Sequence, residues 1–182
     1  MTQANFSAEV ARRIAINEGC RVTRYLDSLG IWTIGIGFNC ERADAAGELA
    51  AVGARLVDVM GGLPIAPAQA QALFERCLSG LEHDARASLD AGVFDALTDA
   101  RRFVLCDLEY NLGSRGWLGF TTTRALLSEA QAQKLAGRVT IAHQLFQVAG
   151  DHLAASAWNG QVGQRATRDI AMIRTGEWVP AS

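Results

Sequence analysis

Lysine and proline are scarce in this sequence. Lys134 is the one lysine among 17 basic residues, and only three prolines occur in 182 residues. No apolar run approaches the roughly 20 residues that a membrane-spanning helix needs. The opening MTQANFSAE also lacks the basic and apolar stretches of a signal peptide. We therefore expect a cytoplasmic chain with no membrane anchor and no membrane insertion.

Charge of either sign is modest. The chain is 49% hydrophobic and 20% charged, with a formal net charge of −2, which is the balance of one globular domain spanning residues 1–182. At this length, folding buries roughly 70% of the surface of the extended chain, which is enough for a proper core. The arginines are interleaved with acids, and no RNA-binding or basic-region motif is present. Nucleic acid is therefore not an expected partner.

Metal-ligand patterns are absent from the sequence. No C-x-x-C pair and no H-E-x-x-H spacing occurs, so neither a zinc site nor a cofactor is expected. The residue types that such sites use are scattered along the chain: Cys20, Cys40, Cys77, Cys106, His83, His143 and His152. We expect the cysteines to be buried or half-buried free thiols and the histidines to lie at the surface.

Most of the sequence has helical periodicity, with one β-prone exception near the start. Residues 21–27 and 31–37 are β-prone runs around a turn at Ser28–Gly30, which predicts a hairpin. A helix capped by Ser7 and ending at Glu18–Gly19 should precede it. Further helices are expected over residues 44–60, 67–89, 98–112, 121–136, 139–156 and 162–174, with a loop at 116–120.

This order of elements predicts a mostly helical α+β fold. Residues 19–65 would form a small β-containing lobe, and residues 1–18 with 66–182 a larger helical lobe. Glu18 would end a helix, Asp27 would end the first strand, and Thr33 would lie on the return strand, all at the edge of a cleft between the lobes. Two carboxyl groups beside a cleft are the minimum equipment for cleaving a glycosidic bond. Spacing alone also allows two solvated acids at element ends.

The hairpin carries a longer pattern, E-G-x-x-x-x-x-Y-x-D-x-x-G-x-x-T-I-G-x-G, from Glu18 to Gly37. This pattern resembles the catalytic signature of the phage-type lysozymes, glycoside hydrolase family 24. Residues 100–120, 156–168 and 173–178 are similar to the core helix and C-terminal helices of that family. Residues 38–65 and 126–153 match loosely, and the second of these segments is longer than in compact members.

The resemblance implies a muramidase that hydrolyses the β-1,4 bond between N-acetylmuramic acid and N-acetylglucosamine in peptidoglycan. Glu18 would be the general acid, and Asp27 with Thr33 would position the water. The family usually inverts configuration, which requires carboxyl groups roughly 6.5–9.5 Å apart. Four further residues match positions near the substrate: Tyr110, Asn111, Thr123 and Arg165.

Each of these supporting residues has a plainer interpretation. Tyr110 and Asn111 are also explained as residues near a helix end, and capping is favoured over sugar contact for Thr123. Arg165 occupies the place of a cation near the catalytic Glu, where positioning is a better role than pKa tuning, because a cation lowers a carboxyl pKa. Trp158 and Trp178 are expected in the core.

The sequence departs from the family at two points. Phe38 stands where many relatives carry His, and Cys77 where the next helix often carries an acid. The biological role implied is a monomeric endolysin, held in the host cytoplasm until a holin-type membrane partner admits it to the cell wall. The alternatives are a non-catalytic peptidoglycan-binding descendant of the fold and a toxin or virion-borne wall-degrading domain.

Overall fold

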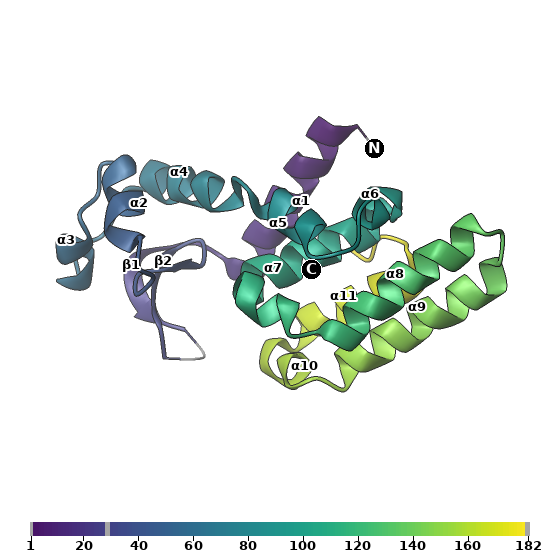
Figure 1. Cartoon of the computed structure of the whole chain (residues 1–182). Helices are drawn as coiled ribbons and strands as arrows, with labels where there is room; N and C mark the ends of the chain where they lie inside the picture. Colours follow the sequence, from purple (N-terminus) through teal and green to yellow (C-terminus); the bar gives the residue numbers. More distant parts are fainter. Residues whose placement is uncertain (1, 28–29, 181–182) are drawn as a thin grey trace. The chain divides into compact units, whose positions relative to one another are not determined.

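The computed structural model describes residues 2–27 and 30–180, which divide into two compact units (Figure 1). The sheet unit comprises Ala11–Gly80. The helical unit comprises the described residues up to Val10 and those from Leu81 onward. Helix α1 (Gln3–Glu18) contributes residues to both units. The mostly helical α+β fold class predicted above is confirmed, because helices dominate and the strands form one small antiparallel sheet.

Helix α1 begins earlier than predicted. Thr2 Oγ1 accepts a hydrogen bond from the Asn5 amide at 3.4 Å, which places the cap there. Ser7 lies inside the helix, and its hydroxyl donates to the Gln3 carbonyl at 3.3 Å. The predicted end is confirmed, since the helix stops at Glu18 and Gly19 takes a left-handed φ of 66°.

The predicted hairpin is present and carries a third strand. Strand β1 (Arg21–Leu26) pairs antiparallel with β2 (Trp32–Gly35), which pairs in turn with β3 (Phe38–Asn39). Tyr25 lies opposite Thr33 in the register. Ser28 and Leu29 of the predicted turn lie outside the described residues. Strand β2 ends at Gly35 because the chain turns there, at φ 65°, to begin β3.

Three helices complete the sheet unit: α2 (Ala45–Ala51), α3 (Leu56–Met60) and α4 (Pro67–Leu78). The single helix predicted over residues 44–60 is wrong, because Gly53 turns the chain at φ 75°. The unit extends to Gly80, beyond the lobe boundary expected at residue 65, since α4 packs on the sheet. Its core contains Ile34, Phe38, Cys40, Ala45, Leu49, Val59, Ile65, Ala70 and Leu73.

The helical unit contains α5 (Leu81–Ala87), α6 (Val93–Ala96), α7 (Asp99–Leu118), α8 (Thr121–Leu135), α9 (Val139–Ala154), α10 (Ala157–Val162) and α11 (Gln164–Thr175) (Figure 1). Residues 67–89 form two helices rather than one, because Gly80 breaks them at φ 89°. Gly113 leaves the helical conformation as predicted, yet the helix resumes after it and ends at Leu118, so the predicted loop at 116–120 is wrong for residues 116–118 and confirmed for 119–120. Helix α10 lies where a break was expected.

Aromatic side chains fill the core of the helical unit. Trp117 is fully buried and its indole N–H donates to Ser88 Oγ at 2.7 Å. Trp158 is buried as predicted, and the half-buried Trp178 ring packs 5.6 Å from that of Phe103. Among residues 2–27 and 30–180, no helix has both the length and the apolar character to cross a bilayer.

The four cysteines are free. Cys40 and Cys106 are buried and Cys77 is half-buried, as expected, whereas Cys20 is exposed. Burial raises the pKa of the Cys40 thiol, and that of Cys77, to about 11. These two thiols therefore stay protonated and unreactive near neutral pH.

Candidate functional site

The three residues of the predicted catalytic set all belong to the sheet unit. Glu18 is the last residue of α1, Asp27 directly follows β1, and Thr33 lies on β2. Glu18 and Asp27 are half-buried, while Thr33 is only 4% exposed. The three residues lie at the positions in the helix and hairpin that the sequence motif predicted.

Ile31 fixes both Asp27 and Thr33 through its backbone. The Ile31 amide donates to Asp27 Oδ1 at 2.9 Å, and the Ile31 carbonyl accepts from the Thr33 hydroxyl at 3.1 Å. The Asp27 amide also donates to the Ile31 carbonyl at 3.0 Å. The Thr33 hydroxyl therefore donates its one hydrogen to the backbone, and the lone pairs of the hydroxyl oxygen remain to accept a further hydrogen bond.

Gly37 packs directly against the Glu18 side chain. A Cβ atom placed at Gly37 would lie 2.8 Å from Glu18 Oε2 and 3.1 Å from Glu18 Cδ. The backbone at Gly37 also has a left-handed φ of 70°, which residues with a side chain adopt only with strain. Glycine is required here for two reasons, and one of them is to leave room for the Glu18 carboxyl group.

Tyr25 lies beside both carboxyl groups. Its pKa is raised by burial first and then by the charge of Glu18, with a smaller contribution from Asp27. Arg21 opposes this shift, and its guanidinium lies 4.6 Å from the Tyr25 ring centroid. The phenol therefore stays neutral and can donate a hydrogen bond near the two acids. Sequence reasoning treated Tyr25 only as a motif position, although its place two residues before Asp27 sets both on one face of the strand.

The four supporting residues belong to the helical unit. Tyr110 is half-buried on α7, and Asn111 follows it. Asn111 Oδ1 accepts from the Trp158 indole at 2.8 Å, so half of its amide is already engaged within the unit. The interpretation of Thr123 as a helix cap is wrong, because α8 begins at Thr121 and Phe120 holds the cap position.

Thr123 is 2% exposed and lines a shallow cavity of about 170 Å³ at the start of α8. The other residues around this cavity are Gly119, Phe120, Thr121, Thr122 and His152. Three neighbouring threonine hydroxyls and an imidazole give the cavity a polar lining. Such a lining suits a hydroxyl- or amide-bearing ligand.

Arg165 forms a buried ion pair with Asp107. Its guanidinium donates to Asp107 Oδ2 at 2.6 Å and to Oδ1 at 2.9 Å, and the Asp107 side chain is fully buried. Asp169, 1% exposed, lies against the same pair. Burial and the neighbouring Asp107 carboxylate raise its pKa well above the ordinary value, which favours the protonated form of Asp169. Neither acid was singled out from the sequence, and the relation of Arg165 to Glu18 stays a prediction.

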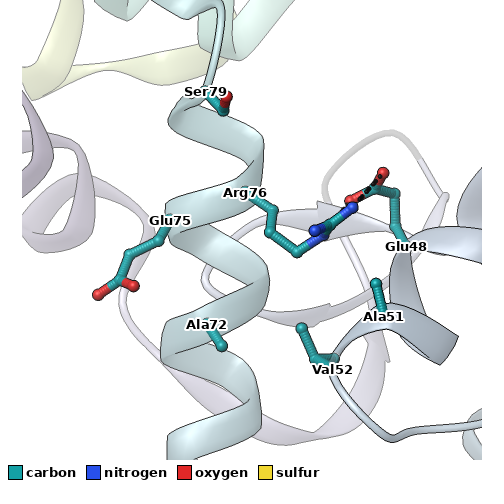
Figure 2. A pocket seen from close by; sticks show the side chains of 7 residues that line it. All are labelled: Glu48, Ala51, Val52, Ala72, Glu75, Arg76 and Ser79. Carbon is teal, nitrogen blue, oxygen red and sulfur yellow. Dashed lines mark hydrogen bonds and ion pairs between the residues drawn. The ribbon is translucent and has the colours of Figure 1, made fainter.

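A larger cavity, of about 620 Å³, lies between α2 and α4 (Figure 2). Arg76 donates to Glu48 Oε2 across it at 2.7 Å. Arg76 pairs with one of the two acids that line the cavity, the second being Glu75, and none of the predicted site residues lines it. Within the described part of the chain, no cluster of three or more His, Cys, Asp or Glu side chains could hold a metal ion.

Comparison with protein families gives one match that covers most of the chain. The family described as phage lysozyme matches residues 15–167. The matched range begins within α1 before Glu18 and continues through the hairpin, α7 and Arg165. It therefore includes every residue of both predicted sets.

Proposed function

This chain belongs to the phage lysozyme family, and on that premise we propose that it is a muramidase that cleaves the β-1,4 bond between N-acetylmuramic acid and N-acetylglucosamine. Family membership supports a peptidoglycan-hydrolysing enzyme. The roles of Asp27 and Thr33 in this proposal rest on their hydrogen bonds to the backbone of Ile31. These bonds fix two hydrogen-bond acceptors that could together hold the attacking water.

In this proposal Glu18 is the general acid that protonates the leaving oxygen. Asp27 acts as general base on the attacking water. Tyr25 remains neutral beside them and donates a hydrogen bond without adding a negative charge. Positioned proton transfer contributes on the order of 10²–10⁴ in rate, so the loss of Glu18 removes most of the activity.

The hydrogen bonds around Ile31 favour attack by water with inversion. The Thr33 hydroxyl donates a hydrogen bond to the Ile31 carbonyl, so its oxygen accepts a hydrogen bond from one O–H group of the water. The Asp27 carboxylate accepts a hydrogen bond from the other O–H group. The lone pair of the water oxygen is then left free to attack the anomeric carbon, and the carboxyl separation expected is roughly 6.5–9.5 Å.

The helical unit supplies the remaining substrate contacts in this proposal. Arg165 is held by Asp107 and presents a fixed cation. Tyr110 and the free amide N–H₂ of Asn111 contact sugar, and the polar cavity beside Thr123 takes part of the glycan or its peptide. The enzyme acts as a monomeric endolysin in host lysis, with a holin-type partner that gives it access to the wall.

A turbidity assay on bacteria with exposed peptidoglycan tests the reaction. We expect wild-type protein to clear the suspension and Glu18→Gln to clear it at a rate lower by about 10²–10⁴. The matched control is Glu75→Gln, an exposed acid of the sheet unit that accepts a hydrogen bond from the Gln71 side-chain amide.

Two outcomes of this assay would contradict the proposed function. If wild type and Glu18→Gln bind wall fragments equally and neither clears the suspension, the chain is a non-catalytic binding module. If both clear the suspension at the same rate, Glu18 is not the acid. Reducing-end analysis of the released glycan distinguishes inversion from retention.

A further inference from the structure

The turn between α8 and α9 exposes large aliphatic side chains to solvent. Every residue from Lys134 to Ile141 is exposed, and we call residues 134–141 the hairpin tip. Leu135 is 76% exposed, Val139 65% and Ile141 45%. Single exposed aliphatics are ordinary on a protein surface, but three within eight consecutive exposed residues concentrate apolar surface at this turn.

The hairpin tip is an ordered, convex projection. The buried residues of α8 end at Gln131, and those of α9 begin at Ala142. The Arg138 amide donates to the Gln133 carbonyl at 2.8 Å, and Gly137 takes a left-handed φ of 76°, which fixes the turn. In Figure 1 the turn extends beyond the other helices of the helical unit.

The hairpin tip carries positive charge and no negative charge. Lys134 and Arg138 lie within it, and no Asp or Glu occurs between Ala130 and Gly150. Over residues 2–27 and 30–180, neither cation forms an ion pair, and Arg138 donates to the neutral Gln133 amide oxygen at 3.1 Å. The tip is therefore locally basic in a chain whose net charge is −2.

We propose that the hairpin tip docks on an anionic lipid surface, with Leu135 and Val139 entering the headgroup region and Lys134 and Arg138 binding lipid phosphates. Aliphatic side chains flanked by basic residues whose long stems reach toward the phosphates are typical of interfacial membrane contacts. The proposal concerns reversible surface binding and does not depend on the hydrolytic activity.

Other partners fit the hairpin tip less well. A protein interface buries about 800 Å² on each partner, which a convex turn with three aliphatic side chains does not offer. Nucleic acid binding would use more cations and aromatic side chains for stacking, and the tip has no aromatic residue. A lipid headgroup layer deforms around a convex tip, and its phosphates complement the two cations.

Co-sedimentation of the purified full chain with lipid vesicles tests the proposal. Vesicles of phosphatidylglycerol mixed with phosphatidylethanolamine should bind the protein, whereas phosphatidylcholine vesicles should bind it far less. Lys134→Gln/Arg138→Gln should lower partitioning about 25-fold, since each basic residue contributes about fivefold. Leu135→Ser/Val139→Ser should lower it roughly tenfold. Added salt should weaken binding of the wild type.

A matched control removes exposed aliphatics elsewhere. Val57 and Leu63 are 62% and 58% exposed in the sheet unit, beside the mixed-charge pair of Arg55 and Asp58. Val57→Ser/Leu63→Ser should therefore leave vesicle binding unchanged. All variants change exposed residues, and circular dichroism verifies their folding. If a serine variant unfolds, the charge variant alone decides.

Several results would overturn the proposal. If the wild-type protein fails to bind anionic vesicles, or binds phosphatidylcholine vesicles equally well, either result contradicts the proposal. So does a loss of vesicle binding in Val57→Ser/Leu63→Ser as large as that in Leu135→Ser/Val139→Ser. Light scattering that shows a dimer broken by Leu135→Ser/Val139→Ser would identify a second copy of the chain as the occupant instead. If the wild-type protein binds anionic vesicles but does not clear the bacterial suspension, the proposed function is contradicted and this inference stands.

Discussion

The carboxyl pair Glu18 and Asp27 and the carboxyl pair Asp107 and Asp169 are held in opposite ways. In the sheet unit, Glu18 and Asp27 are half-buried, and Asp27 is fixed by a backbone amide. In the helical unit, Asp107 and Asp169 are fully or almost fully buried and share one arginine, Arg165. The first pair stays open to a reactant, whereas the second has its protonation decided by burial. Burial and partner choice thus separate a pair suited to chemistry from a pair suited to structure.

The largest expected effect comes from removing the partner of Arg165. Asp107→Leu leaves a buried guanidinium without its bidentate carboxylate, and it should lower the free energy of unfolding by about 3–5 kcal/mol. Asp107→Leu/Arg165→Leu removes both charges and should be less destabilised than the single variant. Urea unfolding measures both, and a double variant at least as unstable as the single one would contradict the ion-pair argument.

The next effect tests the geometry of the open pair. Gly37→Ala places a methyl group 2.8 Å from Glu18 Oε2, so the acid must move. We expect activity to fall about 100-fold, as for a displacement of about 1 Å in an active site. The control Gly62→Ala has a similar left-handed backbone, φ 93°, with nothing within 4 Å of the new atom. Equal activity in the two variants would mean that Gly37 does not position Glu18.

A pH series tests whether Asp169 holds a proton. Because its pKa is raised in the folded state, the folded chain keeps this proton above about pH 4 while the unfolded chain loses it. Wild-type stability should therefore fall, relative to Asp169→Asn, by about 1.4 kcal/mol per pH unit until the folded pKa is reached. The control is Asp151→Asn, an exposed acid that is paired with Arg174. Parallel stability curves for wild type and Asp169→Asn would contradict the assignment.

The smallest expected effect is the loss of one hydrogen bond between neutral groups in the helical unit. Asn111→Ala leaves the buried Trp158 indole N–H without its acceptor and should lower stability by about 1 kcal/mol. Thermal unfolding measures this change, and the KM for a soluble glycan is measured beside it. A raised KM with unchanged stability would assign Asn111 to substrate alone.

The sequence predicts which elements carry Glu18, Asp27 and Thr33, because the determinants of these elements are local. Glu18, Asp27 and Thr33 lie within one hairpin motif, and the helix stop at Gly19 needs only the preference of glycine for positive φ. The role of Gly37 against Glu18 depends on where α1 ends relative to the turn, which the motif implies but does not specify.

The buried pair could not be predicted in the same way. Arg165 and Asp169 are one helical turn apart and visible as such, but Asp107 joins them from α7 through tertiary packing. The helix breaks were also only partly predictable. Gly53, Gly80 and Gly113 all take a positive φ, but the apolar pattern looks continuous across Gly53 and Gly80, so of these three the sequence predicts a break only at Gly113.

The division of the chain into units has a consequence for synthesis. The sheet unit is one continuous segment, Ala11–Gly80, whereas the helical unit joins residues up to Val10 with those from Leu81 onward. A ribosome therefore releases the whole sheet unit before α5 emerges. The first turns of α1 must wait until Glu82 and Arg102, their own partners, have emerged as well. Closing that long loop is an entropic step that the sheet unit never has to make.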